Sequence, residues 1–478
     1  MRTIYLIARS EWLYWIRSRL VLGSIFIFLV LLTVSAFFTA SHMDAENHAR
    51  VHQQTKAEET FLAQPDRHPH RMVHYGHYAF RTPAPLAGFD PGLDTVTGQS
   101  IFLEGHRQNT VMFPESSASS DFGGLSGLNP ALIYQIFAPL LIILLAYNAI
   151  GREREAVVLT PMLAIGITGR TLIVGKALAL LSFMLLMLIP LLISSAFALV
   201  EGESFMALLT LFIIYFMYLA IWIGLTLFMS IILKKGSTVL AVMTGLWFIF
   251  SLVLPSIAVN IATKTSAVSG KIETDLAMLK DVRKVGDGHN TKDPAFQKMR
   301  QDLLAKYKVE RLEDLPINFR GMVAMEGERK LTEVLNRYAK ERMLSEAKQE
   351  KLISSYGWFT PSISIAFASR SIAGTDLSNY HRFQKEAEAL RYKFIQGLNR
   401  VQTEALSYED DMNRNKDKAS SERARINSSN WEVLDKFEFG TEDLSLRIAN
   451  AIASIQMLLI WLIAVFGVLI WRSKGIKA

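Results

Sequence analysis

Four closely spaced histidines are this chain's nearest approach to a metal-binding pattern: His68, His70, His74 and His77. A metal ion needs two to four such side chains to converge on one point. A proline after the first histidine and a glycine before the last argue against one helix presenting the other three on a common face. We therefore expect a turn-rich loop whose histidines form hydrogen bonds or face solvent, and we treat the four as weak metal-site candidates.

Residues 169–176 have the composition of a phosphate-binding loop but lack its spacing. Five residues separate Gly169 from Gly175, where the motif has four, and Ala177 stands where Ser or Thr would coordinate magnesium. The sequence offers no convincing acid, base or nucleophile set. It also has no cysteine, which excludes disulfides, thiolate metal sites and cysteine nucleophiles. We expect no catalytic residue and no resident cofactor in this chain.

Six uncharged apolar runs dominate the sequence and set its fold class. Half of the 478 residues are apolar, 20% are charged, and the mean hydropathy is +0.23. Each run provides about the 20 helical residues that cross a bilayer core. We therefore predict an all-α polytopic membrane protein with six transmembrane helices, which cover residues 20–40, 131–150, 177–200, 205–233, 238–262 and 448–471.

Short basic segments predict the orientation of these spans. Residues 1–19, 151–176, 234–237 and 472–478 are rich in Arg and Lys, and with six spans they all lie on one side. Short basic loops stay in the cytoplasm, so we predict that both termini are cytoplasmic, in the cytoplasmic (inner) membrane of a bacterium. The net charge of +7 is then mainly a topology signal, and it gives no support for a nucleic-acid partner.

Two loops are too long to be simple connectors and are expected to fold outside the membrane. Residues 41–130 form a first periplasmic loop domain that holds the histidines. Residues 263–447 form a larger domain, which we predict to be mainly helical, with long helices over 320–353 and 378–406. Residues 356–373 alternate small and apolar side chains, and we expect them to lie on or near the outer membrane surface.

The cytoplasmic segments contain two unusual elements. Residues 1–19 contain no Pro or Gly, and arginines lie near both ends of the segment. This pattern predicts an amphipathic helix on the membrane surface, with Glu11 among its apolar residues. Glu11 either pairs locally with an arginine or anchors this helix to machinery at the inner face. Residues 151–176 begin with the charged turn Arg152 to Glu155, continue as a short helix, break near Pro161 and re-enter the membrane at Lys176.

Together these features resemble the type-2 ABC transporter permeases. The resemblance rests on the amphipathic N-terminal elbow, the ERE turn after the second span, the Pro that follows it, and the Gly-Lys that enters the third span. In that family the loop between the second and third spans is the coupling helix, which docks on a separate ATPase. The residues that would couple to the ATPase are Glu11, Arg152, Glu153, Arg154, Glu155, Thr160, Pro161, Met162 and Leu163.

Two outer segments resemble an uncharacterised branch of the same permeases, with large periplasmic insertions after spans one and five. The first runs from His68 to Leu93 and is followed by LEGHRQN, at residues 103–109; the second runs from Thr360 to Asn399. The resemblance implies a permease without ATPase activity of its own. Two cytoplasmic ABC ATPase subunits would bind ATP and Mg, and a second permease, identical or homologous, would complete the pore.

The predicted spans contain no ionisable residue, which weakens a channel or ion-coupled transporter interpretation. An uncharged interior suits an amphiphilic, lipid-like or peptide cargo, and the family resemblance favours export. Two alternatives remain open. The first alternative to the exporter is an ABC-type mechanical transducer that acts on a periplasmic partner without translocating a substrate. The second is an ATP-independent membrane receptor or scaffold.

Overall fold

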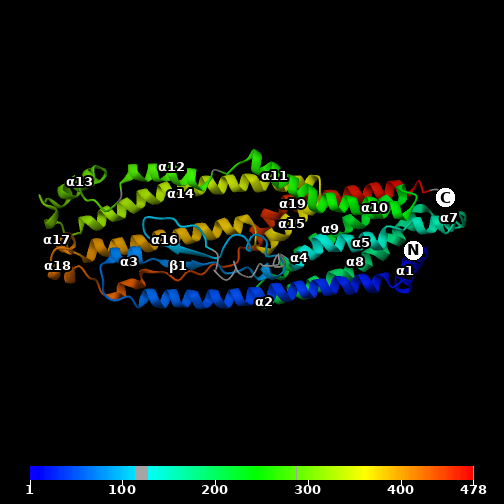
Figure 1. Cartoon of the computed structure of the whole chain (residues 1–478), viewed down its shortest axis with the longest axis horizontal. Coiled ribbons are helices and arrows are strands. Elements are labelled where there is room, and N and C mark those ends of the chain that lie inside the picture. Colours follow the sequence, from blue (N-terminus) through cyan, green and yellow to red (C-terminus); the bar gives the residue numbers. More distant parts are fainter. Residues whose placement is uncertain (113–127, 269, 287, 477–478) are drawn as a thin grey trace.

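The computed structural model describes residues 1–112, 128–268, 270–286 and 288–476. It is elongated, with a helical bundle at one end and a helical domain at the other (Figure 1). Both termini lie at the bundle end, which we call the near end; the opposite part is called the distal domain. Residues 113–127 of the predicted first loop, residues 269 and 287 of the second, and Lys477 of the basic tail lie outside the described residues.

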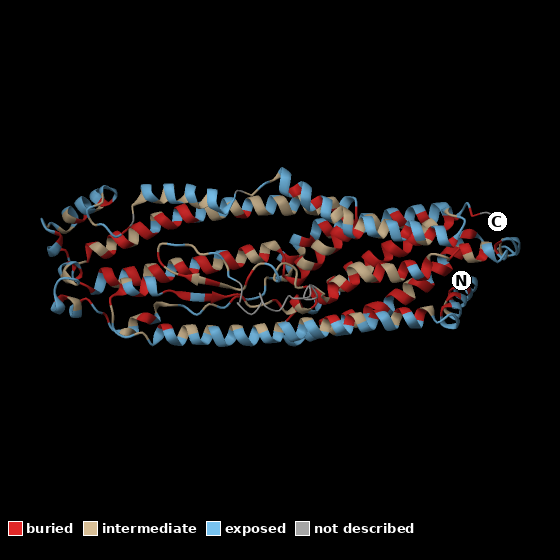
Figure 2. Ribbon diagram, in the orientation of Figure 1, coloured by how far each residue is buried: buried red, intermediate tan, exposed pale blue. Residues whose placement is uncertain are grey.

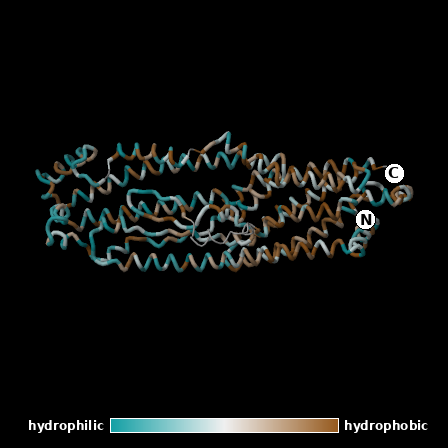
Figure 3. Tube along the Cα trace, viewed as in Figure 1, coloured by the Kyte–Doolittle hydropathy of each residue, from teal (hydrophilic) through white to brown (hydrophobic). Residues whose placement is uncertain are grey.

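Six helical segments of the described chain are long and apolar enough to cross a membrane, in agreement with the number of apolar runs. They comprise α2 (Leu20–Leu62), the segment Pro130–Glu155 with α4, η3, α5 and α6, α8 (Gly169–Val200), α9 (Phe205–Ile232), the segment Gly236–Thr265 with α10, η4 and α11, and α19 (Leu444–Ser473). Apolar residues concentrate in this half of the molecule (Figure 3). The chain thus has the helical, polytopic build predicted from its hydropathy.

The remaining elements are short helices at the near end and the helices and hairpin of the distal domain. The near end adds α1 (Arg2–Arg17) and α7 (Leu159–Ala164). The distal domain and its connections contain α3 (Pro69–Tyr75), β1 (His77–Phe80), η1 (Pro85–Gly88), β2 (Ser100–Leu103), α12 (Lys271–Val285), η5 (Pro294–Phe296), α13 (Gln297–Tyr307), η6 (Leu312–Asp314), α14 (Phe319–Ser355), η7 (Tyr356–Trp358), α15 (Pro361–Ala373), α16 (Leu377–Ala405), α17 (Tyr408–Asn413), α18 (Lys418–Arg423) and η8 (Ser428–Val433).

Helix α2 does not stop at residue 40, where the predicted span ends, but continues unbroken to Leu62. Its second half contains Ala, Glu, Gln and Lys, which favour helix without being apolar. At its far end Phe61 is buried against Phe394 of α16, with ring centroids 5.3 Å apart. The first predicted loop therefore begins with a rigid helical extension that reaches the distal domain (Figure 1).

Residues 356–373 do not lie on the outer membrane surface as expected. They form η7 and α15, and nearly all of α15 is buried between α9 and α19 (Figure 2). Gly357 accepts a hydrogen bond from Trp461 Nε1 at 3.1 Å, and Thr360 Oγ1 donates to Phe250 O at 2.9 Å. Both partners lie well inside their own apolar segments, so this part of the chain re-enters the bundle. Small Ser and Ala side chains permit that close packing.

Apolar clusters and buried polar groups hold the distal domain together, and one of these groups is the fully buried carboxylate of Asp411. Asp411 accepts hydrogen bonds from His68 Nε2 at 3.1 Å, Asn318 Nδ2 at 2.9 Å and Gln402 Nε2 at 2.7 Å. Arg414 and Arg320 supply positive charge beside it. One carboxylate thus connects α3, α14, α16 and α17.

A pH dependence of distal-domain stability follows from Asp411. Burial alone raises the pKa of this carboxyl, but the hydrogen bonds from His68 and Gln402 and the positive charge of Arg320 outweigh burial and hold the pKa well below its usual range. Between the folded and the unfolded pKa the unfolded chain binds more protons, so this contribution is complete above about pH 4 and is lost as the pH falls further. Asp411→Asn is expected to flatten the acid limb of unfolding followed by circular dichroism; an unchanged limb would contradict this assignment.

Candidate functional site

Helix α1 is fixed at the near end by contacts with α8. Trp12 Nε1 donates to Ser182 Oγ at 2.8 Å, and the rings of Trp12 and Trp15 pack against Phe183. The buried face of α1 consists of Ile7, Ala8, Glu11 and Trp15. An ionisable residue therefore lies in the middle of the contact surface, where it requires partners of opposite charge.

Glu11 finds these partners on other segments and not on its own helix. Its Oε1 lies 2.5 Å from Arg152 Nη2 and 2.6 Å from Lys176 Nζ. The same ammonium lies 2.6 Å from Glu153 Oε1, and Arg152 Nη2 is 3.1 Å from that oxygen. Two cations and two carboxylates thus form a compact, neutral group, which we call the ion cluster. Lys176 has only 1% of its side chain exposed.

The ion cluster joins three segments that are distant in sequence. Glu11 comes from α1, Arg152 and Glu153 from α6, and Lys176 from the first two turns of α8. Sequence reasoning noted the Gly-Lys pair as a family feature but did not place Lys176 among the site residues. The signal that could have found it is its position, a lysine directly before an apolar run, where burial needs a paired carboxylate.

Arg154 connects the same loop to the end of α9. Its guanidinium donates to the carbonyl oxygens of Ser230, Ile231 and Leu233 at 2.9–3.2 Å. These carbonyls lie at the end of α9, where a helix lacks internal donors. On the neighbouring span, the Gly236 backbone N–H points to Glu155 Oε1 at 3.5 Å. Any displacement of the 151–155 turn is therefore transmitted directly to the ends of α9 and α10.

Helix α7 and its flanking residues form the exposed tip of the near end (Figure 1). Leu159 is buried and anchors the helix, Met162 and Leu163 are half-buried, and Thr160 and Pro161 are exposed. On either side, Val157 and Ile165 leave 73% and 77% of their surface exposed. The nine predicted coupling residues thus divide into charged residues that mainly fasten the loop and an α7 group that faces outward or is half-buried. We call Val157, Val158, α7 and Ile165 the tip.

The four candidate histidines separate into two that converge and two that do not. His68 caps α3 and pairs with Asp411, while the His77 ring packs against Phe61 with centroids 5.7 Å apart. His70 and His74 instead lie beside His106 and His289, which were not among the candidates. His106 stands in the LEGHRQN segment, but nothing in the sequence spacing connects it to His289.

A buried polar contact near the distal end of the bundle was also absent from the sequence-based site. Asp90, from the first long loop, accepts a hydrogen bond from Ser369 Oγ at 2.5 Å. The same serine Oγ lies 3.0 Å from Tyr215 OH. The predicted spans contain no acid, yet the fold brings one from outside against α9 and α15. No residue type or spacing within the spans points to this contact.

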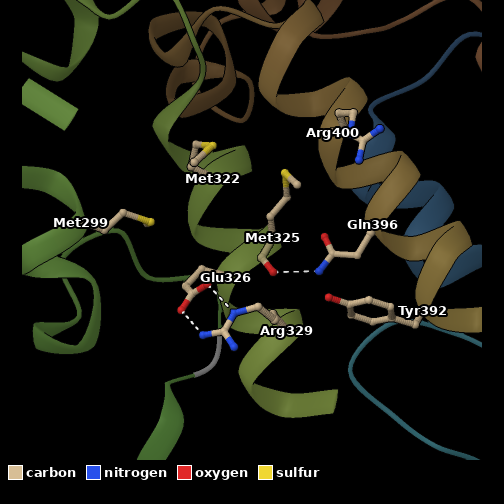
Figure 4. Close-up of a pocket in the computed structure, with 8 residues that line it drawn as sticks. All are labelled: Met299, Met322, Met325, Glu326, Arg329, Tyr392, Gln396 and Arg400. Atoms are coloured by element: carbon tan, nitrogen blue, oxygen red, sulfur yellow. Dashed lines mark hydrogen bonds and ion pairs between the residues drawn. The ribbon is translucent and has the colours of Figure 1, made fainter. Parts of the chain in front are cut away.

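The distal domain also has a pocket of about 330 Å³ between α13, α14 and α16 (Figure 4). Three methionines, Met299, Met322 and Met325, line one part of it. Its polar side includes the Arg329–Glu326 ion pair and a hydrogen bond from Gln396 Nε2 to Met325 O at 2.9 Å. This mixture of thioethers and an already paired arginine offers less specific chemistry than the four converging histidines.

Comparison with protein families gives a match in the second long loop. A family model described as "Domain of unknown function (DUF3526)" matches residues 271–440. The matched segment starts with α12 and includes α13 to α18 and η8. It covers most of the distal domain and the helix α15 that re-enters the bundle, but neither α1, the 151–163 loop nor any of the six long apolar segments. No curated protein matches the chain.

Proposed function

We propose that this chain is the membrane-spanning subunit of an ATP-driven ABC exporter, energised by a separate ATPase that binds ATP and Mg. The observation that carries the proposal is the exposed apolar tip, mounted on a loop that ion pairs and hydrogen bonds connect to α1, α8, α9 and α10. A solvent-exposed apolar surface on a firmly supported element is typical of a protein-binding site.

The supporting contacts give the tip a mechanical role in this proposal. Movement of an ATPase surface against α7 would be transmitted through Glu153 to Lys176 on α8 and through Arg154 to the end of α9. Glu11 would carry α1 along with them. Packed helices respond to such a push as rigid bodies, so a small displacement at the tip changes how the spans are arranged.

The cargo that suits this bundle is amphiphilic, lipid-like or peptide-like, because the predicted spans contribute no ionisable residue for ion coupling. The buried acid that reaches them, Asp90, belongs to the first long loop and lies near the distal end of the bundle. A second permease, identical or homologous, would complete the assembly. In the segment Gly236–Thr265 only 11% of the most apolar window is buried within one chain. Membrane lipid or the second permease would cover this surface, and chemical crosslinking in native membranes distinguishes the two.

A mechanical transducer is the second candidate, and the continuity of α14 favours it. This helix runs without interruption from the distal domain to η7, which contacts α19 deep in the bundle. A change among the spans would therefore move the distal domain directly, where a periplasmic partner could bind. ATP-dependent cargo movement in reconstituted vesicles supports the exporter; ATP-dependent distal motion without any cargo movement supports the transducer.

The experiment that tests the proposal is co-purification with the double variant V157E/I165E, expressed in its native host. We expect the unaltered chain to bring a stoichiometric ATPase with it. Carboxylates forced into an apolar contact cost on the order of 2–4 kcal/mol, so the variant should retain at most about a tenth of that ATPase. The matched control is Val96→Glu, an equally apolar and exposed position that is far from the tip.

Equal thermal stability of both variants shows that any loss of the ATPase is not caused by unfolding. If the unaltered chain brings no ATPase, the exporter proposal fails and an ATP-independent receptor or scaffold takes its place. If V157E/I165E retains the ATPase fully, the tip is not its docking surface.

A further inference from the structure

Four histidines from three separate segments converge in the distal domain. One ring nitrogen of each of His70, His74, His106 and His289 lies within 4.8 Å of the corresponding atoms of the other three. Their ring centroids are 4.6 to 6.1 Å apart in all six pairs. Among the residues that the structure describes, no carboxylate oxygen belongs to this group of ligand atoms. We call it the histidine cluster.

Local sequence explains how two of the rings come together. His68 accepts a hydrogen bond from the His70 backbone N–H and so starts α3, with Pro69 in its first turn. One turn later His74 lies above His70 on the same helix face. The short helix ends at Gly76 because its φ of +71° is in the left-handed region. The proline and glycine that argued against one helix for three histidines therefore delimit a helix that presents two.

The other two rings arrive through close backbone contacts. Gly105 N–H donates to Val73 O at 3.0 Å, which places His106 beside α3. Gly288, before His289, has φ of +69° and lies against Gly327 of α14; a Cβ on Gly288 would be 3.4 Å from the Gly327 Cα. The chain thus uses a glycine directly before each of these two histidines.

An outer layer of buried groups orients His106. Glu328 has no exposed side-chain surface, and its Oε2 lies 3.2 Å from both Nδ1 and the backbone nitrogen of His106. Arg391 holds the other oxygen of Glu328 at 2.6 Å. With Nδ1 on the carboxylate, Nε2 is the ring nitrogen left for another partner, and it is buried without a hydrogen bond. A carboxylate that fixes one nitrogen while the other faces a metal is a recurrent arrangement in metal sites.

The electrostatics of the cluster favour neutral rings. Burial, followed by the neighbouring histidines, lowers the pKa of His70 to about 2, and the same causes lower the pKa of His74. Neutral imidazole is the form that binds a metal ion. Four nitrogen donors with no competing carboxylate suit zinc and its neighbours among the divalent transition metals, and do not suit calcium or magnesium.

We propose that His70, His74, His106 and His289 form a four-imidazole site for a divalent zinc ion. Zn–N bonds of 2.0–2.1 Å place the ligands of a tetrahedral site about 3.4 Å apart, so the rings need only a small inward movement from their present separation. Exposure of His74 and His289 leaves a path for the ion. Four protein ligands leave no open position, so the ion would be structural and not catalytic.

The position of the site defines its role. His70 and His106 belong to the first long loop, whereas His289 lies in the segment that matches the domain of unknown function, residues 271–440. A bound ion would cross-link the first long loop to the second, next to the C-terminal end of α12. This inference does not depend on the transporter assignment, because the histidine cluster lies in the distal domain and needs no ATPase.

The test is zinc titration of the purified full chain, stripped of metal, in detergent. We expect one zinc ion per chain and a thermal midpoint that rises with zinc. The variant H106A/H289A should bind zinc at least about 100-fold more weakly and show no zinc-dependent midpoint. Glu328→Gln, which keeps the shape of the outer layer, should weaken zinc binding about 10- to 100-fold. His48→Ala, an exposed histidine on α2, is the matched control and should bind zinc normally.

Cobalt provides a second readout that does not depend on stability. Replacing zinc with Co²⁺ should produce the visible absorption bands of a tetrahedral nitrogen site, and these should be absent from H106A/H289A. If the unaltered chain binds no stoichiometric zinc, if it binds Cu²⁺ alone, or if the double variant with normal folding keeps its zinc, the proposal is overturned. Any of these outcomes leaves the ATPase co-purification result unaffected, so the two proposals fail separately.

Discussion

Replacing Lys176 with methionine is expected to lower the free energy of unfolding by about 3–5 kcal/mol, among the largest effects of any single substitution in this chain. The ammonium is 2.6 Å from both Glu11 Oε1 and Glu153 Oε1, and the lysine is almost completely buried. Without it, Arg152 alone faces two buried carboxylates. Removing one partner of a buried ion group costs more than the group contributes, because the remaining charge stays desolvated.

The matched design separates charge from packing at this position. The triple variant K176M/E11Q/E153Q removes the excess negative charge and should recover most of the lost stability, because neutral groups of similar shape replace the buried ions. Lys474→Met, at an exposed lysine of the same end, should have an effect below about 0.5 kcal/mol. Thermal unfolding in a mild detergent, followed by tryptophan fluorescence, measures all three variants.

Equal stability of the single and triple variants would show that the ion cluster is not held as described. A stable triple variant has a further use under the transporter proposal. It should keep the ATPase bound through the tip, yet hydrolyse ATP without moving cargo, because the link from the loop to α1 and α8 is reduced to weak hydrogen bonds. Co-purification and transport assays on the same preparation separate docking from coupling.

The spans could be predicted from the sequence because hydropathy over 20 residues is a local property. A predicted span ends where the uncharged apolar run ends, which is not always where the helix ends. In α2 the charged residues from Asp44 to Lys56 follow the apolar run while the helix continues to Leu62. Glu, Gln, Lys and Ala have high helix propensity, so a prediction based on propensity instead of hydropathy would have extended α2.

Hydropathy could not predict that α15 is buried in the bundle, because this helix is short and only moderately apolar. Helix α15 has 13 residues, too few to span a bilayer, and its Ser and Ala content is equally compatible with a surface helix. Its burial depends on the polar groups that receive it, including Tyr215 and Tyr218 of α9. Those contacts join residues more than 140 positions apart, and spacing along the chain contains no information about them.

The candidate sites show the same division. The loop at residues 151–163 could be found from its charge pattern and position, but the pattern did not indicate that its charged residues mainly turn inward. Two of the four histidines in the cluster, His70 and His74, could be named from the sequence because they lie close together on one short helix. His106 and His289 could not, because separate loops bring them to that helix. Residues that act together through tertiary contacts remain hidden until the fold is known.

The second large effect is expected at Arg391, the centre of the distal domain. Its guanidinium has 1% exposure and donates to Glu328, Glu388 and Thr332 at 2.6 to 2.9 Å, and to Glu104 O at 3.2 Å. It therefore satisfies two buried carboxylates at once and connects α14, α16 and the first long loop. Arg391→Met should destabilise the distal domain by about 3–5 kcal/mol, measured by chemical unfolding with hydrogen exchange to locate the loss.

Arg391→Lys separates the effect of charge from that of geometry, because lysine keeps the positive charge but cannot reproduce the planar set of guanidinium N–H donors. We expect it to retain part of the stability while leaving Thr332 or Glu104 O without its donor, at about 1–3 kcal/mol. Arg329→Met, an exposed arginine on α14 with two acidic neighbours, is the control and should cost less than about 1 kcal/mol. Similar losses for Arg391→Met and Arg329→Met would contradict the central role of Arg391.

Zinc connects this result to the histidine cluster. Arg391 supports the cluster from two sides, since it holds Glu328 beside His106 and donates to Glu104 O two residues before that histidine. Arg391→Lys should therefore weaken zinc binding without removing any ligand. Because an ion that binds only the folded domain stabilises it in proportion to the logarithm of its concentration, excess zinc should restore part of the stability of Arg391→Lys. The variant H106A/H289A/R391K should gain nothing from zinc, and a gain there would place the metal effect somewhere other than at the four histidines.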